Sequence, residues 1–201
     1  MFGICLAGMA AVGCTAQTEQ EQEVTTASEQ MLEETGTAVQ DEQEEKQKAV
    51  FGDFEACDIN REKVTQEIFS NSEVTMVYMW ASYSEECIHQ LADLAVLAEE
   101  FTEHTDAGKF QIIGIPIDSL DQSGSASSIQ MHQIRTILKE TRAEFLQVIP
   151  SYDLITSKLK EVVLLPEILF VDSDGIQIGD WHSGLMELDT MRKLIQEELR
   201  P

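Results

Sequence analysis

Four consecutive residues, Ser84-Glu85-Glu86-Cys87, bring a hydroxyl, two carboxylates and a thiol together in one short stretch. A thiol in the first turn of a helix can take part in thiol–disulfide exchange, because the helix dipole favours the attacking thiolate. Here Glu85 and Glu86 disfavour a thiolate at Cys87. Ser84 cannot replace a thiol, since an alcohol stays un-ionised at neutral pH without an adjacent base. Cys87 thus has two interpretations, a small buried residue or a single thiol that is capped or joined to a partner.

The other cysteines and histidines do not extend this stretch into a metal or disulfide site. Cys57 is the other cysteine expected in the folded region, and a predicted hairpin holds it away from Cys87, so we expect no disulfide between them. His89 follows Cys87 by two residues, which places the two side chains on different faces of a helix. We therefore expect no metal and no cofactor; the remaining histidines are His104, His132 and His182.

Two predicted elements position the stretch. Residues 74–80 form a run of β-branched, aromatic and Met side chains, short enough to be a buried strand. From Cys87 onward apolar residues recur at helical spacing, which predicts a helix of about five turns. Ser84 suits the N-cap of this helix, because its hydroxyl can accept a hydrogen bond from a free backbone N–H. The positive end of the helix dipole favours Glu85 and Glu86 in the first turn.

Residues 80–87, Trp-Ala-Ser-Tyr-Ser-Glu-Glu-Cys, resemble a known motif. It is the W-A-T-W-C-P-P-C motif of extracytoplasmic thioredoxin-like thiol–disulfide oxidoreductases, the TlpA/ResA-like group. Trp80, Ala81 and Cys87 match that motif in type and position. Ser84 stands where the group has its attacking cysteine, and Cys87 stands where it has the resolving cysteine. The resemblance implies a redox site that has lost its nucleophile and keeps one residual thiol.

Two further departures point the same way. Gln90 occupies the position where the group often carries a Glu that assists proton transfer, and Ala92 replaces a helix-kinking Pro. Together with Ser84, these three substitutions favour the loss of ordinary dithiol catalysis.

A second match lies near the C-terminus. Leu165-Pro166, followed by an apolar run and by Asp172-Ser173-Asp174-Gly175, resembles the group's cis-proline, strand and turn. The sequence alone does not predict the cis form, because most X-Pro bonds are trans. The resemblance implies a cis-proline facing the active-site motif, and a groove that binds an extended polypeptide. Its predicted lining is Trp80, Tyr83, Leu165 and Pro166; the alternative for the two aromatic residues is packing in the core and at its rim.

The order of predicted elements gives the fold class. The continuous apolar runs of 74–80 and 110–118 indicate neighbouring parallel strands that are covered on both faces. A hairpin precedes the first run, and a helical insertion, which the TlpA/ResA-like group also has, follows the second. We predict an α/β, thioredoxin-like fold: a central mixed sheet with helices on both faces. The remaining elements are a hairpin beginning at 54–59, helices at 129–145, 152–160 and 187–199, and strands at 162–172 and 176–181.

The N-terminal region divides into two segments. Residues 1–14 carry no charge and end in Ala11-Val12-Gly13-Cys14, which resembles a bacterial lipobox whose cysteine becomes lipidated. About a dozen apolar residues are too few to span a bilayer, so this segment is interpreted as a lipoprotein signal; the alternative is a buried apolar segment. Residues 15–50 hold ten acidic and two basic residues and no aromatic, which predicts a disordered acidic tether. The thioredoxin-like domain is expected at 51–201.

Charge narrows the range of partners. The chain has 37 acidic and 13 basic residues and a formal charge of −24. The tether accounts for −8, which leaves −16 on residues 51–201. Nucleic acid and anionic lipid surfaces are poor partners for such a field. We expect a membrane contact through the lipid anchor alone and a location on the extracytoplasmic face of a bacterial membrane.

Three functional hypotheses follow. The first is a membrane-anchored, redox-degenerate protein that binds a polypeptide partner in the cis-proline groove. The second is a thiol–disulfide oxidoreductase of reduced capability that uses Cys87 as a single thiol. The third is a structural or solute-handling lipoprotein domain with a vestigial groove.

Overall fold

The structure is a computed structural model, and it describes residues 48–103 and 109–200. The predictions for the signal segment, for lipidation at Cys14, for most of the tether and for His104 lie outside these residues. Within the described ranges no helix has the length and apolar character needed to cross a membrane.

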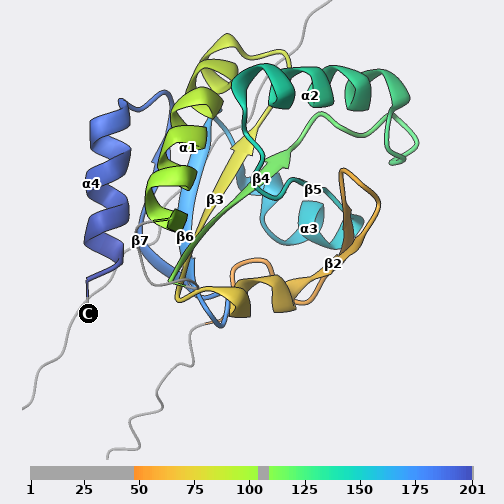
Figure 1. Cartoon of the computed structure of the whole chain (residues 1–201). Helices are drawn as coiled ribbons and strands as arrows, with labels where there is room; N and C mark the ends of the chain where they lie inside the picture. Colours follow the sequence, from red (N-terminus) through yellow and green to blue (C-terminus); the bar gives the residue numbers. More distant parts are fainter. Residues whose placement is uncertain (1–47, 104–108, 201) are drawn as a thin grey trace, which may run out of the picture. The chain divides into compact units, whose positions relative to one another are not determined.

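The sheet that carries the Trp80–Cys87 stretch has four strands in the order β4-β3-β6-β7 (Figure 1). Central strand β3 (Val74–Trp80) runs parallel to β4 (Phe110–Pro116) and antiparallel to β6 (Glu167–Asp172), which pairs antiparallel with β7 (Gln177–Ser183). All seven residues of β3 are buried, because both faces of the sheet are covered. The predicted mixed sheet is confirmed.

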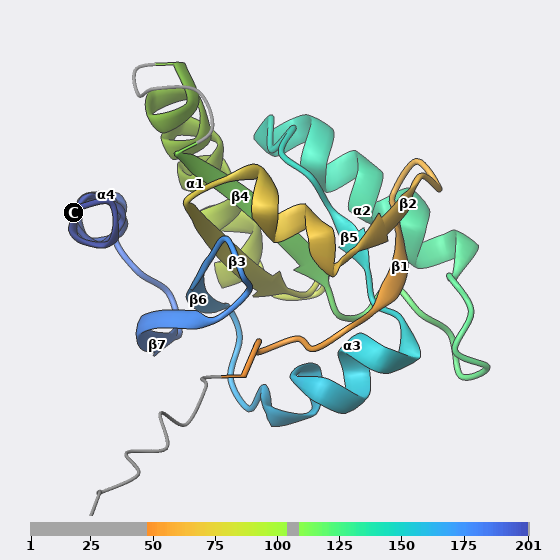
Figure 2. The same ribbon diagram turned by 90° about the horizontal axis from the view of Figure 1, so that it is seen from below.

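Alternate residues of β3 enter two different cores. Met76 and Tyr78 pack with residues of α1 (Glu85–Glu103), α2 (Ser128–Thr141) and α4 (Leu188–Glu198). Figure 2 shows α1 and α3 (Tyr152–Ser157) on opposite sides of the strands. Val77 and Met79 pack on the other face with the N-terminal hairpin and with Leu154 of α3. This alternation follows from the two-residue period of a strand, and it places helices on both faces as predicted.

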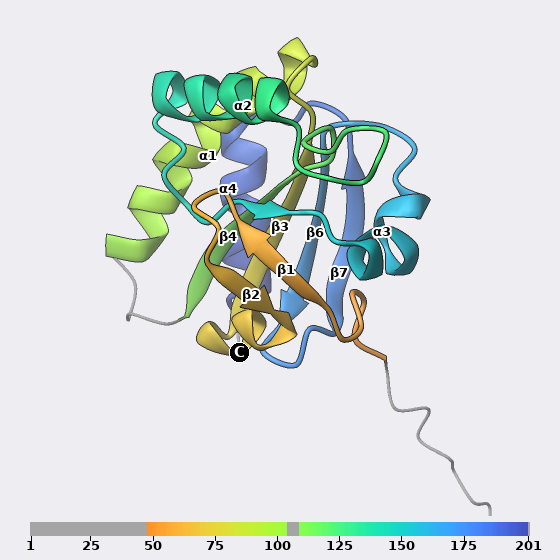
Figure 3. The same cartoon turned by 90° about the vertical axis from the view of Figure 1, so that its right-hand side faces the viewer.

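The predicted N-terminal hairpin belongs to a second, small sheet of order β2-β1-β5 (Figure 3). Strand β1 (Glu55–Asp58) pairs antiparallel with β2 (Lys63–Thr65), which confirms the hairpin. The Asp58 side chain accepts hydrogen bonds from the backbone N–H groups of Asn60 and Glu62 at 2.7 and 2.8 Å and so closes the turn. Strand β5 (Val148–Ile149) pairs with the other side of β1 and was not predicted. A 3₁₀ helix, η1 (Gln66–Asn71), leads into β3.

Three predicted elements have a boundary that differs from the structure by three residues or more. Helix α2 ends at Thr141, because Arg142 adopts a left-handed conformation with φ 57° and closes the helix. The predicted helix 152–160 is α3 followed by a short 3₁₀ helix, η2 (Leu159–Glu161). Strand β6 begins only after Pro166, so residues 162–165 precede the strand rather than form its first half. A proline has no N–H to donate to a strand ladder, which explains this start.

Candidate functional site

The site lies at the end of the sheet where β3 stops and α1 begins. We refer to this end of the strands as the edge. The Ser84 hydroxyl accepts a hydrogen bond from the Cys87 backbone N–H at 3.3 Å, and the Ser84 carbonyl accepts one from the Ile88 N–H at 3.1 Å. The predicted N-cap is therefore confirmed. Glu85 and Glu86 are exposed in the first turn of α1. Ser84, which stands where the motif has its attacking cysteine, thus caps the helix.

Cys87 lies inside the core, with no exposed surface. The Tyr78 hydroxyl donates a buried hydrogen bond to the Cys87 carbonyl at 2.8 Å. Burial, together with the adjacent Cys87, raises the pKa of Tyr78 far above its usual range, so this hydroxyl stays protonated and can only act as a neutral donor. Cys87 is a free thiol, and an external disulfide has no open path to it in this conformation.

Hydrogen bonds fix the loop between β3 and α1. The Asp118 carboxylate accepts hydrogen bonds from the Ser82 backbone N–H at 3.0 Å and from the Ser82 hydroxyl at 2.6 Å. Gln133 of α2 donates from Nε2 to the Ser82 carbonyl at 3.1 Å. Sequence reasoning gave no role to Asp118 or Gln133. The position of Asp118, as the polar last residue of the second predicted strand, was the available signal.

The two aromatic residues of the motif have opposite environments. Tyr83 is 73% exposed, whereas Trp80 has no exposed surface. Trp80 Nε1 donates to Gln147 Oε1 at 3.0 Å within the core. The prediction that Trp80 lines a groove is therefore wrong: Trp80 lies on a strand covered on both faces and points into the core shared with α1 and α2. The core packing weighed as the alternative is the one observed.

Pro166 lies at this edge, directly before the neighbouring strand β6. The Leu165–Pro166 peptide bond is cis, which confirms that prediction. Met79 pairs with Glu167, so Pro166 lies beside the end of β3, and the Pro166 carbonyl accepts a hydrogen bond from the Gly184 N–H at 2.7 Å. Pro166 itself is buried and Leu165 is half-buried.

Of the predicted lining only Tyr83 is exposed, and the other exposed apolar side chains at this edge were not predicted. Val163 is 95% exposed, Leu164 56% and Leu185 52%. A Cβ added at Gly184 would lie 3.8 Å from Leu164 Cδ2, so the segments 163–165 and 184–185 adjoin. We refer to Tyr83, Val163, Leu164 and Leu185 together as the edge surface.

A buried polar cluster lies behind Pro166. The Lys158 ammonium lies 3.2 Å from the centre of the Trp181 ring and forms an ion pair with Glu161 at 3.2 Å. Glu167, directly after Pro166, is only 4% exposed, and its Oε2 has no hydrogen-bond partner among the described residues. Burial raises the pKa of Glu167, and the nearby Lys158 together with a hydrogen bond from Ser183 partly opposes that rise. Sequence reasoning missed this cluster, although a Glu inside an apolar strand was a visible signal.

Gln90 occupies a fully buried position one turn after Cys87. Its Nε2 lies 3.4 Å from the Met186 carbonyl and 3.0 Å from the Met191 sulfur. The amide is neutral at all pH values, so Gln90 cannot serve as an acid or a base toward Cys87. Its contacts instead place segment 184–187 beside the first turns of α1.

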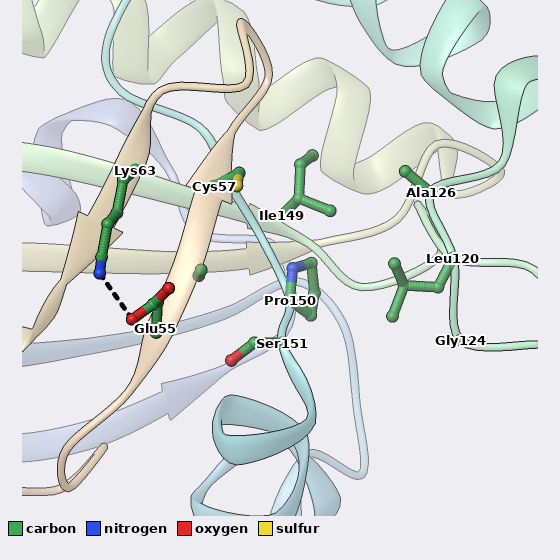
Figure 4. A pocket seen from close by; sticks show the side chains of 10 residues that line it. Glu55, Cys57, Lys63, Leu120, Gly124, Ala126, Ile149, Pro150 and Ser151 are labelled. Carbon is green, nitrogen blue, oxygen red and sulfur yellow. Dashed lines mark hydrogen bonds and ion pairs between the residues drawn. The ribbon is translucent and has the colours of Figure 1, made fainter.

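Cys57 lies apart from this edge. It is an exposed free thiol on β1 and lines a cavity of about 390 Å³ between the small sheet and the loop that carries Leu120 and Ala126 (Figure 4). Glu55 and Lys63, which form an ion pair at 2.6 Å, line the same cavity. No disulfide joins Cys57 to Cys87.

Within residues 48–103 and 109–200, no three His, Cys, Asp or Glu side chains lie in an arrangement that could hold a metal ion.

Comparison with solved structures identifies the fold. A thiol:disulfide interchange protein of the thioredoxin family from Chlorobium tepidum superposes with a TM-score of 0.58 at 13% identity, covering 74% of this chain and 94% of that one. The exposed lipoprotein thioredoxin of Streptococcus pneumoniae gives a TM-score of 0.51 at 20% identity, covering 73% and 99%. ScoI of Arabidopsis thaliana, solved with copper bound, gives 0.58 at 14% identity, covering 76% and 99%.

These likenesses show that the chain has the thioredoxin-like fold, as the motif and the element order predicted. No protein-family model matches the chain, and no curated protein sequence matches it. A thiol:disulfide interchange protein and a copper-bound protein share this fold. The fold alone therefore does not select a chemistry, and the residues at the site must.

Proposed function

Starting from a thioredoxin-like fold, we propose that this protein is a redox-degenerate member of that fold, which binds a polypeptide partner at the sheet edge beside Pro166. One observation carries the proposal: the thiol of Cys87 is fully buried, while the hydroxyl of Ser84, where the motif has its attacking cysteine, caps α1. Thiol–disulfide exchange needs a thiolate that reaches a disulfide sulfur. An exposed apolar surface beside an intact scaffold instead favours binding.

The partner surface is the edge surface together with half-buried Leu165. Val163, Leu164 and Leu185 expose more than half of their area next to the cis-proline. The adjoining exposed apolar segments 163–165 and 184–185 on a strongly acidic domain favour a protein-binding role over simple solubility. A polypeptide is the partner class that supplies both apolar side chains and backbone hydrogen-bonding groups.

The proposed location is the extracytoplasmic face of a bacterial membrane, with Cys14 as the lipid anchor. The lipobox-like sequence at Ala11–Cys14 and the acidic residues that follow it support this. The fold is shared with an exposed lipoprotein thioredoxin. Metabolic labelling with a palmitate analogue is expected to tag the chain, and Cys14→Ser is expected to abolish the tag and release the protein from the membrane fraction. A labelled Cys14→Ser variant contradicts the anchor.

Reduction of insulin disulfides by dithiothreitol tests the loss of catalysis. The full chain is expected to leave the rate at the uncatalysed level. A matched Ser84→Cys variant, which supplies the second sulfur, is expected to form a titratable dithiol and to accelerate the reaction. Turnover by the unmodified chain that disappears in Cys87→Ala overturns the proposal.

A second candidate function is single-thiol exchange by Cys87. The observation that favours it is that Cys87 keeps a free thiol, with the neutral Tyr78 hydroxyl hydrogen-bonded to the Cys87 carbonyl. Capture of partners by the full chain with and without reductant separates the two candidates. Partners retained by Cys87→Ala without reductant indicate surface binding, whereas partners lost in that variant, or released only by reductant, indicate a mixed disulfide.

A further inference from the structure

Three exposed carboxylates lie within three residues of Tyr83 or Leu185 of the edge surface. Glu85 and Glu86 are exposed in the first turn of α1, and Glu187 is exposed at the N-cap of α4. The contact between Gln90 Nε2 and the Met186 carbonyl holds the segment with Leu185 and Glu187 beside α1. The exposed side chains near this edge thus include both apolar groups and carboxylates.

These carboxylates have little local compensation. Among the described residues, no Lys or Arg forms an ion pair with Glu85, Glu86 or Glu187. The N-terminus of α1 contributes about half a positive charge. The edge therefore stays negative at neutral pH.

The backbone beside the cis-proline is also available. Residues 163–165 belong to no helix or strand, and no backbone hydrogen bond joins them to another described residue. Val163 and Leu164 are exposed, so their N–H and C=O groups can pair with an extended chain from outside.

We infer that the polypeptide segment bound at this edge is extended, apolar and cationic: its backbone pairs with residues 163–165, its apolar side chains contact the edge surface, and its Lys or Arg side chains lie near Glu85, Glu86 and Glu187. The inference rests on the proposed function and adds the chemical class of the partner. Charge complementarity of this kind selects partners and directs their approach.

Fluorescence anisotropy of the full chain with labelled ten-residue peptides tests the inference. One peptide alternates Leu and Lys, and in two matched peptides Gln or Glu replaces every Lys. We expect the Lys peptide to bind about fivefold more tightly than the Gln peptide, and the Glu peptide to bind most weakly. In the double variant Glu85→Gln/Glu86→Gln, the preference for Lys over Gln is expected to fall below about twofold.

A matched control removes the same charge at the opposite end of β3. Glu67 and Glu73 are exposed before the start of that strand, and Glu67→Gln/Glu73→Gln is expected to leave the preference unchanged. An equal loss in both double variants shows unspecific attraction to an acidic protein and overturns the inference.

The exposed Leu164→Ser variant separates this inference from the proposed function. It is expected to weaken the Lys and Gln peptides alike, because it removes apolar contact and no charge. Equal binding of the Lys and Gln peptides, both weakened by Leu164→Ser, overturns the cationic partner and leaves the polypeptide surface standing. Peptide binding that Leu164→Ser does not change overturns both.

Discussion

The two halves of the Trp80–Cys87 stretch differ in what surrounds them. Trp80, Ala81 and Cys87 have no exposed surface and belong to the core. Tyr83, Glu85 and Glu86 are exposed, and Ser84 is half-buried as a helix cap. These three fully buried positions match the redox motif, whereas the exposed positions and half-buried Ser84 depart from it.

This difference separates the scaffold from the chemistry. Buried residues are constrained by packing density, where a change of even one methylene is felt. Residues on the loop and on the first helical turn can change with little effect on the fold. The scaffold positions Trp80 and Pro166 therefore match the motif, whereas Ser84 stands where the motif has its attacking cysteine.

Truncation of the two aromatic residues tests the comparison most strongly. Trp80→Ala is expected to lower the free energy of unfolding by about 3 to 5 kcal/mol, because it opens a cavity and removes the hydrogen-bond donor to Gln147 Oε1. Tyr83→Ala is expected to change it by less than about 0.5 kcal/mol. Urea denaturation of the full chain, followed by far-ultraviolet circular dichroism, measures both. Similar losses in the two variants contradict the assignment of Trp80 to the core and Tyr83 to the surface.

A second test concerns the buried carboxyl behind the cis-proline. Burial raises the pKa of Glu167, so its contribution to stability is fully present below the pKa of an unfolded Glu and is lost as pH rises through the folded pKa. Glu167→Gln mimics the protonated side chain. The variant is expected to be more stable than the parent at pH 7, and this difference in the free energy of unfolding is expected to close near pH 4, where Glu167 of the folded parent is protonated.

Exposed Glu73 supplies the matched control for this pH series. Glu73→Gln removes an exposed carboxylate at the far end of β3, so it measures the part of any change that comes from losing one negative charge alone. A Glu167→Gln variant that is less stable than the parent at pH 7 would show that Lys158 needs the ionised carboxylate, and it contradicts the predicted direction.

A third test concerns the hydrogen bond that joins β3 to α1. Tyr78→Phe removes the donor to the Cys87 carbonyl without changing the ring, and it is expected to cost about 1 kcal/mol. Amide exchange in the first turns of α1 is expected to accelerate more than in α4. Tyr152→Phe is the control, because Tyr152 is 79% exposed and its variant should match the parent. Equal stability of the two variants argues against this bond as the link between the elements.

Much of the fold was predictable because its signals are local and periodic. The continuous apolar run of β3, the helical spacing after Cys87 and the capping serine fixed the strand, the helix and the turn between them. Pro166 marked the start of a strand, and the motif resemblance supplied its cis form.

The rest depended on contacts between distant residues. Strand β5 has two residues, too few to show a period, and exists because β1 pairs with it. A strand buried on both faces gives no polar alternation, so the sequence did not show which way Trp80 points. Lys158 is buried against Trp181 although lysine is normally exposed. No local rule predicts that contact.

The smallest expected effect is at Ser84, which caps α1 at the position of the motif's attacking cysteine. Ser84→Ala removes the acceptor of the Cys87 N–H, at a long distance of 3.3 Å and at a half-buried position, so the cost is expected at the low end of cap substitutions, about 0.5 kcal/mol. Ser84→Asp keeps an acceptor and is expected to stay within about 0.3 kcal/mol of the parent. Both values come from urea titrations with matched slopes. If alanine proves neutral and aspartate destabilising, the helix needs no cap there, and Ser84 must then be explained by the partner that binds at the edge instead of by the scaffold.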